Sequence, residues 1–587
     1  MISNVVELLN HAQHMSDRTS KLALLLFDFC SAFPSLARKF IFRVLEASKL
    51  PPNIINAIRE LYKDNDHYYA FGGIYKFVFT VFSGVRQGCP LSSAIFAIVT
   101  DPLILYIKAH LSKEAFFRAY CDDYALALKQ VWRDLPTLAV VFSRIAKASA
   151  LVLNLPKCKL LPLWEFSPSQ AARTLKDVCP AWQHLSIDYK AMYLGFLIGL
   201  HAHLHAWDKP LAKYIDRINL IRISKAGFSG AIFLHNVCAI TVFSHVAQLY
   251  EPPIAVITAV NNQLKRLIPA PGNWITPVLM CRIKLLLPFL SQPYDFATWT
   301  LAVRIRVLFC TLRTWTFKFP EPILSVIPVA TGLFFPHATL RRTFDKLVLD
   351  NFVLPCGNFS DRGFNSRVSS LDAHSSVQSL AYEVLFSRSY PREFYQAVYE
   401  KLIKWRLSTP IFKQRPLVEP LVDDALRAGN VFSALRLPAR VLNAILLTWF
   451  QGWVTEERVN QRRVSCHICG AFFTTDSVLH FAHCRPVRLL SERHLGLYKY
   501  GVSNHKQFLC LADEPPHVLR KRAIHLYIFK KSYDYCRVNN ILYFDSLCHC
   551  YRNNLLQFCG LFPFLQDHDF LYNVLTEDDV EVDLMFD

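Results

Sequence analysis

Length, charge and cysteine content narrow the classes of protein to which this chain can belong. Its 587 residues exceed one typical domain, and 52% apolar content is enough for several hydrophobic cores. Lys and Arg number 65 against 46 Asp and Glu, and the resulting net charge of +19 favours a nucleic-acid partner, with an anionic membrane surface as the alternative. Seventeen scattered cysteines exclude a small disulfide-framed secreted domain and favour a reducing compartment.

No segment predicts secretion or a membrane span. Residues 1–20 are polar and amphipathic, unlike a signal peptide. Residues 227–250 lack Lys, Arg, Asp and Glu, but polar side chains interrupt them, so a buried helix is the better interpretation. We therefore expect an intracellular protein with no membrane partner.

The most informative stretch is residues 116–128, Phe-Phe-Arg-Ala-Tyr-Cys-Asp-Asp-Tyr-Ala-Leu-Ala-Leu. Two apolar runs flank Asp122 and Asp123, which predicts a β-hairpin with both acids at its tip. Two carboxylates on a rigid turn repel each other, so the pair is stable only near a cation or strong hydrogen-bond donors. The pattern predicts a metal site, although Asp is also a common turn residue.

Two upstream segments add a third acid and a glycine-containing loop. Residues 21–29, Lys-Leu-Ala-Leu-Leu-Leu-Phe-Asp-Phe, predict a strand buried on both faces, with Asp28 near its end. A carboxylate there is costly unless it is paired or bound to a metal ion. Residues 84–93, Gly-Val-Arg-Gln-Gly-Cys-Pro-Leu-Ser-Ser, predict a loop followed by a helix that begins at Pro90.

The order of these segments resembles the palm of a reverse transcriptase, specifically that of non-LTR (LINE-like) retrotransposons. Two later segments extend the resemblance. Residues 154–159, Asn-Leu-Pro-Lys-Cys-Lys, are similar to the lysine-bearing segment after the catalytic hairpin, and residues 193–199, Tyr-Leu-Gly-Phe-Leu-Ile-Gly, to the turn that grips the primer. Five segments in one order are far more specific than any one of them.

The resemblance implies a role for each of these residues. Asp28 and Asp122 are the implied ligands of two Mg²⁺ ions, and Asp123 is the adjacent catalytic acid. Phe33 is the implied aromatic that excludes a ribose 2′-hydroxyl, with a core aromatic at a strand-to-helix corner as the alternative. The remaining implied contacts are to nucleotide and template, through Arg86, Gln87, Gly88, Tyr120 and Lys157, and to the primer, through Leu194 and Gly195.

The fold class that follows is α+β, a right-hand polymerase palm with a three- or four-stranded antiparallel sheet backed by helices. A helical thumb is expected to begin with a basic helix at 212–225, in which Lys213, Arg217, Arg222 and Lys225 either contact phosphates or form a solvated face. The expected divisions are 1–206 partial fingers and palm, 207–345 thumb, 346–455 helical connection, 456–500 zinc-knuckle-like element, and 501–587 helical C-terminal region with an acidic tail.

A second set of residues has the spacing of a zinc site. Cys466, Cys469, His480 and Cys484 follow the pattern Cys-x2-Cys-x10-His-x3-Cys, which predicts a tetrahedral structural Zn²⁺ site with the first pair on a turn and the second pair on one helix face. His483 is an alternative ligand, and four buried reduced side chains are the alternative to a metal site. The run at 548–550 lacks partners at ligand spacing and is interpreted as incidental.

Three hypotheses of function remain at this stage. The first is an RNA-directed DNA polymerase that extends a DNA primer on an RNA template with deoxynucleoside triphosphates, with a nuclear location implied by the family. The second is a catalytically silent fragment that binds nucleic acid, because the sequence starts at a helix that the family places after its fingers, which implies amino-terminal truncation. The third is a basic helical scaffold in which the motif order is coincidence.

Overall fold

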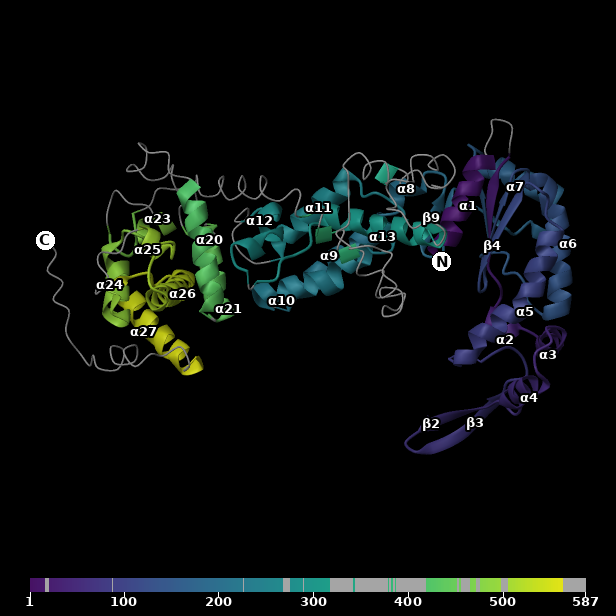
Figure 1. Ribbon diagram of the computed structural model, residues 1–587, viewed down its shortest axis with the longest axis horizontal. Coiled ribbons are helices and arrows are strands. Elements are labelled where there is room, and N and C mark those ends of the chain that lie inside the picture. The colour runs from purple at the N-terminus through teal and green to yellow at the C-terminus, as the bar shows by residue number, and fades with distance from the viewer. Residues whose placement is uncertain are drawn as a thin grey trace. The chain divides into compact units, whose positions relative to one another are not determined.

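The computed structural model divides the chain into two compact units (Figure 1). The first comprises Met1–Lys209, His245–Glu251 and Arg304–His374, and the second Pro210–Ser244, Pro252–Val303 and Ser375–Asp587. Residues 357–376, whose polar composition makes them the best linker candidate, and the expected acidic tail lie outside the described residues. The described residues are 1–15, 21–86, 88–224, 226–267, 275–288, 290–316, 342–343, 378–379, 382–383, 386, 419–435, 437–450, 453–455, 465–470, 476–497 and 505–562.

A five-stranded sheet forms the centre of the first unit. Its strands are β1 (Ala23–Phe27), β4 (Ala115–Tyr120), β5 (Asp123–Leu128), β6 (Lys159–Pro162) and β7 (Ser186–Ile187). They are arranged in the order β4-β5-β1-β6-β7, so β1 is the middle strand and pairs antiparallel with both β5 and β6. All five residues of β1 are buried, as its uninterrupted apolar run predicts.

The sheet has one more strand than predicted, and that strand runs parallel to its neighbour instead of antiparallel. The antiparallel arrangement is confirmed for β4, β5, β1 and β6, whereas β7 is a fifth strand that runs parallel to β6. The prediction of three or four strands was therefore wrong. Because β7 contains two residues, it is too short to produce an alternating pattern in the sequence.

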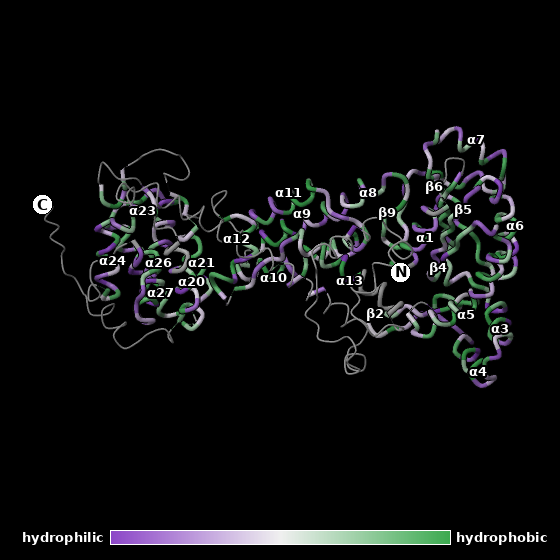
Figure 2. Tube along the Cα trace, turned by 45° about the horizontal axis from the view of Figure 1, so that its top comes forward, coloured by the Kyte–Doolittle hydropathy of each residue, from purple (hydrophilic) through white to green (hydrophobic). Residues whose placement is uncertain are grey.

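Helices supply the rest of the core of the first unit. They are α1 (Ile2–Met15), α2 (Ala32–Ser35), α3 (Arg38–Ala47), α4 (Pro52–Leu61), α5 (Pro90–Ala109), α6 (Val131–Ser149), α7 (Pro168–Val178) and α8 (Ala202–His205). Hydrophobic residues along α5, visible in Figure 2, pack against α3 and α6. Among the described helices, α5 alone is long and apolar enough to cross a membrane, and it packs against α3 and α6 of the same unit.

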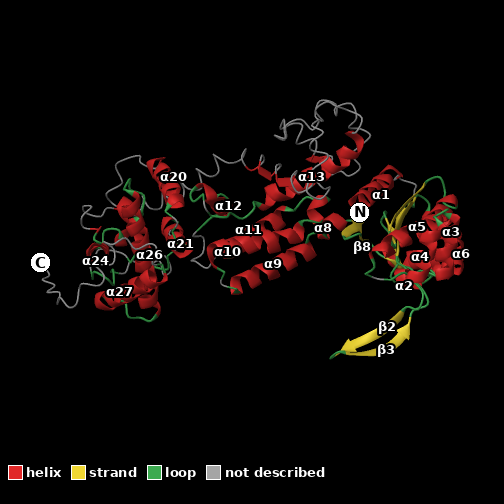
Figure 3. Ribbon diagram, turned by 60° about the horizontal axis from the view of Figure 1, so that its bottom comes forward, coloured by secondary structure: helices red, strands yellow, loops and turns green. Residues whose placement is uncertain are grey.

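A two-stranded hairpin extends from the helices of the first unit (Figure 3). It consists of β2 (Asp66–Phe71) and β3 (Ile74–Thr80), which are joined by a turn at Gly72 and Gly73. Phe71, Ile74 and Tyr75 are each about three-quarters exposed. An exposed apolar patch on so small a sheet is typical of a surface that contacts a partner.

Helices dominate the described part of the second unit. They are α9 (Asp208–Ile223), α10 (Gly227–Leu234), α11 (Ile254–Arg266), α12 (Pro277–Cys281), α13 (Phe296–Thr316, which continues into the first unit), α20 (Glu419–Ala434), α21 (Ala439–Trp449), α23 (Val478–Phe481), α24 (Arg485–Leu495), α25 (His505–Phe508), α26 (Pro516–Val538) and α27 (Phe544–Leu561). The buried helix expected at 227–250 is α10, followed by short π-helical and 3-10 turns. In the C-terminal part, α26 packs against α21, α24 and α27.

Gly84 provides a test of the packing between the α2–α3 corner and the loop before α5. Its N–H donates to the Leu36 carbonyl at 2.8 Å, and a Cβ at this position would lie 2.4 Å from the Pro34 carbonyl oxygen. Gly73 has a similar positive φ but no atom within 4 Å of its Cβ position. We expect Gly84→Ala to lower the free energy of unfolding by about 2 kcal/mol more than Gly73→Ala does. Urea denaturation of the full chain, followed by hydrogen exchange in β1, measures this difference, and equal losses would contradict the packing argument.

Candidate active site

The β4–β5 hairpin places two acids at the end of the central sheet. Tyr120 pairs with Asp123, so Cys121 and Asp122 form a two-residue turn. Cys121 has a φ of 53°, a left-handed conformation that costs a residue other than glycine about 1 kcal/mol. The structure therefore places Asp122 within the turn and Asp123 at the first position of β5.

Asp28, the third acid, directly follows the central strand. The last residue of β1, Phe27, pairs with Tyr124, so Asp28 lies beside the start of β5. Partial burial raises the pKa of Asp123, and the negative charges of Asp122 and Asp28 raise it further. The three carboxylates are therefore close enough to repel one another. A divalent cation relieves such repulsion, and carboxylate oxygens are the ligands that Mg²⁺ prefers.

The aspartates form an open group rather than a closed cage. Among the described residues, the Cys/His set of the second unit is the one group of three or more potential ligands whose ligand atoms all lie within 4.8 Å of one another. The three aspartates are not such a group. An open group of carboxylates suits an ion such as Mg²⁺, which keeps several of its waters when bound.

Helix α1 covers the outer edge of the β4–β5 hairpin. β4 is an edge strand of the sheet, and the Asn4 side-chain amide donates to its Ala119 carbonyl at 2.8 Å. The Arg118 guanidinium of β4 donates to Glu7 of α1 at 2.6 Å. Both side chains of this ion pair are partly exposed, so it contributes no more than about 1 kcal/mol. The main effect of α1 is to cover the edge and fix the position of β4.

The implied nucleotide-side residues lie between α2 and α5. The partly buried Phe33 ring stacks on Phe96 of α5, with 4.3 Å between ring centroids and an interplanar angle of 11°. One face of Phe33 thus packs against the core, as the alternative interpretation expected. Arg86 and Gly88 are exposed, and Gly88 has a φ of 87°, a conformation that favours glycine. Gln87 lies outside the described residues.

The side chains of Tyr120 and Lys157 are both exposed, and Tyr120 retains 41% of its surface. A neighbour of Lys157 that sequence reasoning missed makes closer contact with the site. Cys158 is fully buried, and its Sγ lies 3.3 Å from the backbone nitrogen of Asp28. Burial raises the pKa of this thiol to about 11, so it is neutral at pH 7. A single cysteine between two lysines gave no signal of this contact in the sequence.

The implied primer-grip turn joins β8 (Lys190–Tyr193) to β9 (Phe196–Gly199). Leu194 and Gly195 form the turn with φ values of 47° and 82°. A segment distant in sequence supports it, because His245 Nε2 lies 3.1 Å from the Leu194 carbonyl and Tyr250 donates to the Leu197 carbonyl at 2.7 Å. Neither supporting residue belongs to a recognisable motif, so sequence reasoning missed both.

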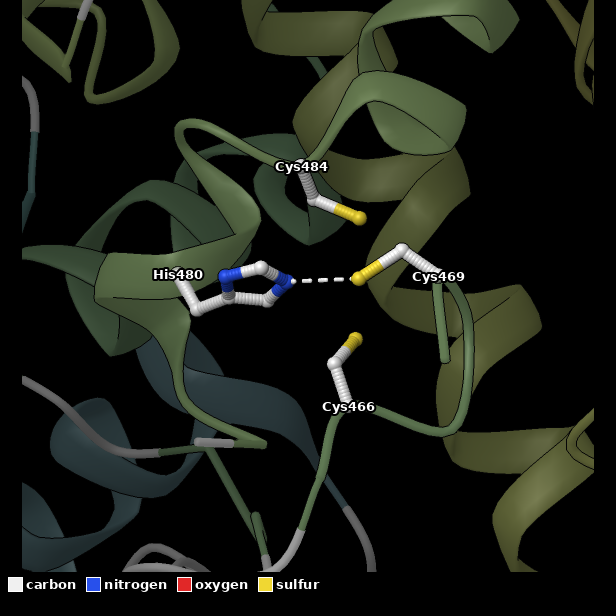
Figure 4. Close-up of side chains that lie close together, drawn as sticks. All are labelled: Cys466, Cys469, His480 and Cys484. Carbon is white, nitrogen blue, oxygen red and sulfur yellow. Dashed lines mark hydrogen bonds between the residues drawn. The ribbon is translucent and has the colours of Figure 1, made fainter. Parts of the chain in front are cut away.

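The four residues with zinc-site spacing converge in the second unit (Figure 4). Cys469 Sγ lies 3.2 Å from His480 Nε2. The first pair lies on a turn, as predicted, and the Gly470 N–H donates to the Cys466 carbonyl at 2.9 Å to close it. The second pair does not lie on one helix face, because His480 belongs to α23 and Cys484 is the N-cap of α24. That part of the prediction was wrong.

The alternative to a metal site was four buried, reduced side chains, and the protonation of Cys466 favours the metal site instead. A hydrogen bond with Cys484 and the proximity of His480 lower the pKa of Cys466, which favours a thiolate, the form that binds metal. His483, the alternative ligand, is not one of the four gathered residues. Phe481, next to His480, packs on Trp453 and on Phe529 of α26, so the cluster is part of a larger helical core.

Comparison with known proteins places the first unit in context. A family model described as "Reverse transcriptase (RNA-dependent DNA polymerase)" matches residues 2–198. The chain is 24% identical over 199 residues to the Xenopus laevis "Transposon TX1 uncharacterized 149 kDa protein", an alignment that covers 32% of this chain and 15% of that protein. A telomerase from Candida albicans, solved with a fragment of telomeric RNA, aligns with 13% identity and a TM-score of 0.26 over 46% of this chain and 47% of its own.

The contact between the β8–β9 turn and His245 can be tested by a double-mutant cycle. A Cβ on Gly195 would lie 2.5 Å from His245 Nε2, and the positive φ of this residue adds strain. We expect Gly195→Ala to destabilise the protein by about 2 kcal/mol or more, and His245→Ala to relieve at least about 1 kcal/mol of that loss by opening space. Denaturation of the parent, both single variants and the double variant measures the coupling. Strictly additive losses would show that the two residues do not meet.

Proposed function

Residues 2–198 belong to the reverse transcriptase family, and we propose that the chain is the RNA-directed DNA polymerase of a non-LTR retrotransposon. The observation that carries this proposal is the meeting of Asp28, Asp122 and Asp123 at one end of a sheet within the matched residues. Similarity to a transposon protein supports the assignment to a mobile element. The chain spans a small part of that relative, so template, primer and cellular location are part of the proposal, with the nucleus as the expected location.

The aspartates have the chemistry that nucleotidyl transfer needs. Nucleotidyl transfer is an in-line displacement at phosphorus, and divalent ions bound here would stabilise the negative charge that develops on the reacting oxygens. Asp28 and Asp122 would hold these ions, and Asp123 would add negative charge beside them. Partial burial and the charges of Asp122 and Asp28 raise the pKa of Asp123, and a divalent cation beside the three acids would relieve their repulsion. The rigid two-residue turn fixes the acids before substrate arrives, which reduces the reorganisation needed during the reaction.

The surrounding residues are proposed to position the substrates. Phe33, held by its stack on Phe96, would present its accessible part to the sugar of the incoming nucleotide and exclude a 2′-hydroxyl. Arg86, Gln87, Gly88, Tyr120 and Lys157 would contact nucleotide and template, and the Leu194-Gly195 turn would contact the primer. The exposure of Arg86, Gly88, Tyr120 and Lys157 is compatible with such contacts.

The Cys/His cluster is proposed to hold one structural Zn²⁺. Three thiols and one imidazole are a common ligand set for tetrahedral zinc, and all four protein ligands leave no open position for catalysis. Because Phe481, next to His480, packs on Trp453 and Phe529, zinc would stabilise the C-terminal helical core. We also propose that the zinc-bound cluster binds nucleic acid in the manner of a zinc knuckle.

The polymerase proposal is tested by primer extension on an RNA template with Mg²⁺ and deoxynucleoside triphosphates. We expect Asp122→Ala to reduce extension by about three orders of magnitude or more, because removal of a metal ligand removes the charge stabilisation of the transition state. Asp177→Ala, which removes an exposed carboxylate on α7, is the matched control and should retain full extension. No extension by the parent, alongside retained salt-sensitive binding of primer-template, would favour the nucleic-acid-binding fragment instead.

The zinc proposal predicts one tightly bound Zn²⁺ per chain. Cys484→Ser should lose most of this zinc and lower the thermal stability of the C-terminal core, because binding of the ion is coupled to folding. Cys548→Ser, a substitution at a partly buried cysteine of α27, should keep its zinc. Metal content by mass spectrometry, with thermal denaturation, measures both. Loss of zinc in the Cys548→Ser variant, or none in the parent, would contradict the assignment.

A further inference from the structure

The backbone of Asp28 has an unusual hydrogen-bond partner. The β1–β6 ladder ends at the pair Leu26 and Lys159, because the preceding residues of the β6 side form a turn. In that turn the N–H groups of Lys157 and Cys158 both donate to the Asn154 carbonyl, at 2.9 and 3.0 Å. With the ladder ended, the Asp28 N–H donates to the Cys158 Sγ at 3.3 Å.

The same turn also holds the carbonyl group of Asp28. The Asn154 N–H donates to it at 2.8 Å, and the Cys158 Sγ lies 3.5 Å from it as a second, weak donor. One turn thus satisfies both backbone groups of the residue that carries the first acid. Beyond the turn the pairing resumes in a register shifted from that of the ladder, since Phe29 pairs with Leu153 and the Cys30 N–H donates to the Val152 carbonyl at 2.8 Å.

Cys158 is suited to this contact by its size and burial. Its side chain is fully buried, so the Asp28 N–H has no access to water on that side, and a buried N–H without a partner is destabilising. The long C–S bond and large sulfur atom let the Cys158 side chain reach the Asp28 N–H, to which the turn offers no backbone carbonyl. A thiol is a weak acceptor, yet it leaves no net charge beside the metal-binding carboxylate.

We propose that Cys158 is a positioning residue for Asp28, whose thiol fixes the backbone of that aspartate and so sets where its carboxylate meets the metal ion. This inference rests on the proposed polymerase function for its consequence in catalysis. It acts through Asp28, because both hydrogen bonds of the Cys158 thiol are with the backbone of that residue. The Lys157–Cys158 segment then has two roles, with the exposed lysine facing solvent and the buried cysteine holding the acid.

Three variants separate positioning from simple packing. Cys158→Ala removes both the acceptor and some volume, whereas Cys158→Ser keeps a hydroxyl that can accept from the Asp28 N–H. Cys179→Ala is the packing control, since Cys179 is a core cysteine of the same unit, 2% exposed, whose thiol contacts the Leu135 carbonyl rather than an aspartate. Thermal denaturation of all three with the parent shows that each is folded.

The decisive measurements are metal affinity and backbone exchange in the full chain. We expect Cys158→Ala to weaken Mn²⁺ binding, followed by electron paramagnetic resonance, and to raise the Mg²⁺ concentration for half-maximal primer extension, each by about tenfold. Hydrogen exchange in the peptide that contains Asp28 should accelerate. Cys158→Ser should recover most of both effects, and Cys179→Ala should show neither.

Two results would overturn the inference. One is an equal effect of Cys158→Ala and Cys179→Ala on Mn²⁺ affinity, which would reduce Cys158 to core packing. The other is an unchanged exchange rate at Asp28 in Cys158→Ala. Neither measurement needs turnover, so the two proposals can fail separately. If the parent does not extend primers but the Cys158→Ala substitution still weakens Mn²⁺ binding, the polymerase proposal is contradicted and the positioning role is supported.

Discussion

Three carboxylates lie at one end of the central sheet, and the fold of the first unit must hold them together against their mutual repulsion. Partial burial raises the pKa of Asp123, and the negative charges of Asp122 and Asp28 raise it further. Folding keeps them together because β1 is buried on both faces and pairs along its length with β5 and β6, which places Asp28 beside the start of β5. The free energy of that core holds the acids in position.

The two flanks of the strands that carry the aspartates are held by segments outside the hairpin and β1. On one side α1 covers β4 and donates to its edge through Asn4. On the other side, the turn at 154–158 forms hydrogen bonds with both the N–H and the carbonyl group of Asp28. The β8–β9 turn follows the same principle, since His245 and Tyr250 hold its backbone from about 50 residues away. In each case a remote segment fixes a local conformation that the turn alone would not maintain.

The sequence predicted those features whose cause is local. The acids of the β4–β5 hairpin are recognisable because two apolar runs and a two-residue turn determine their own register, and β1 is recognisable from its apolar run. β7, Cys158 and His245 are different. A two-residue strand has no period, and a side chain that contacts a backbone group 130 or 51 positions away leaves no pattern near itself.

For the Cys/His cluster, ligand spacing in the sequence predicts which residues come together but not which helices or turns carry them. Spacing correctly selected Cys466, Cys469, His480 and Cys484, because ligands to one ion must converge whatever elements carry them. It did not determine those elements: the interval from His480 to Cys484 fits one helical turn, but Pro486 two residues later lacks the N–H that a continuing helix requires. Pro486 instead lies in the first turn of a new helix, α24, so the chain breaks at Cys484 and that residue becomes the N-cap. The break allows Cys484 to approach the first pair from a different direction than His480 does, which is the geometry that a tetrahedral site needs and that a single helix face would restrict.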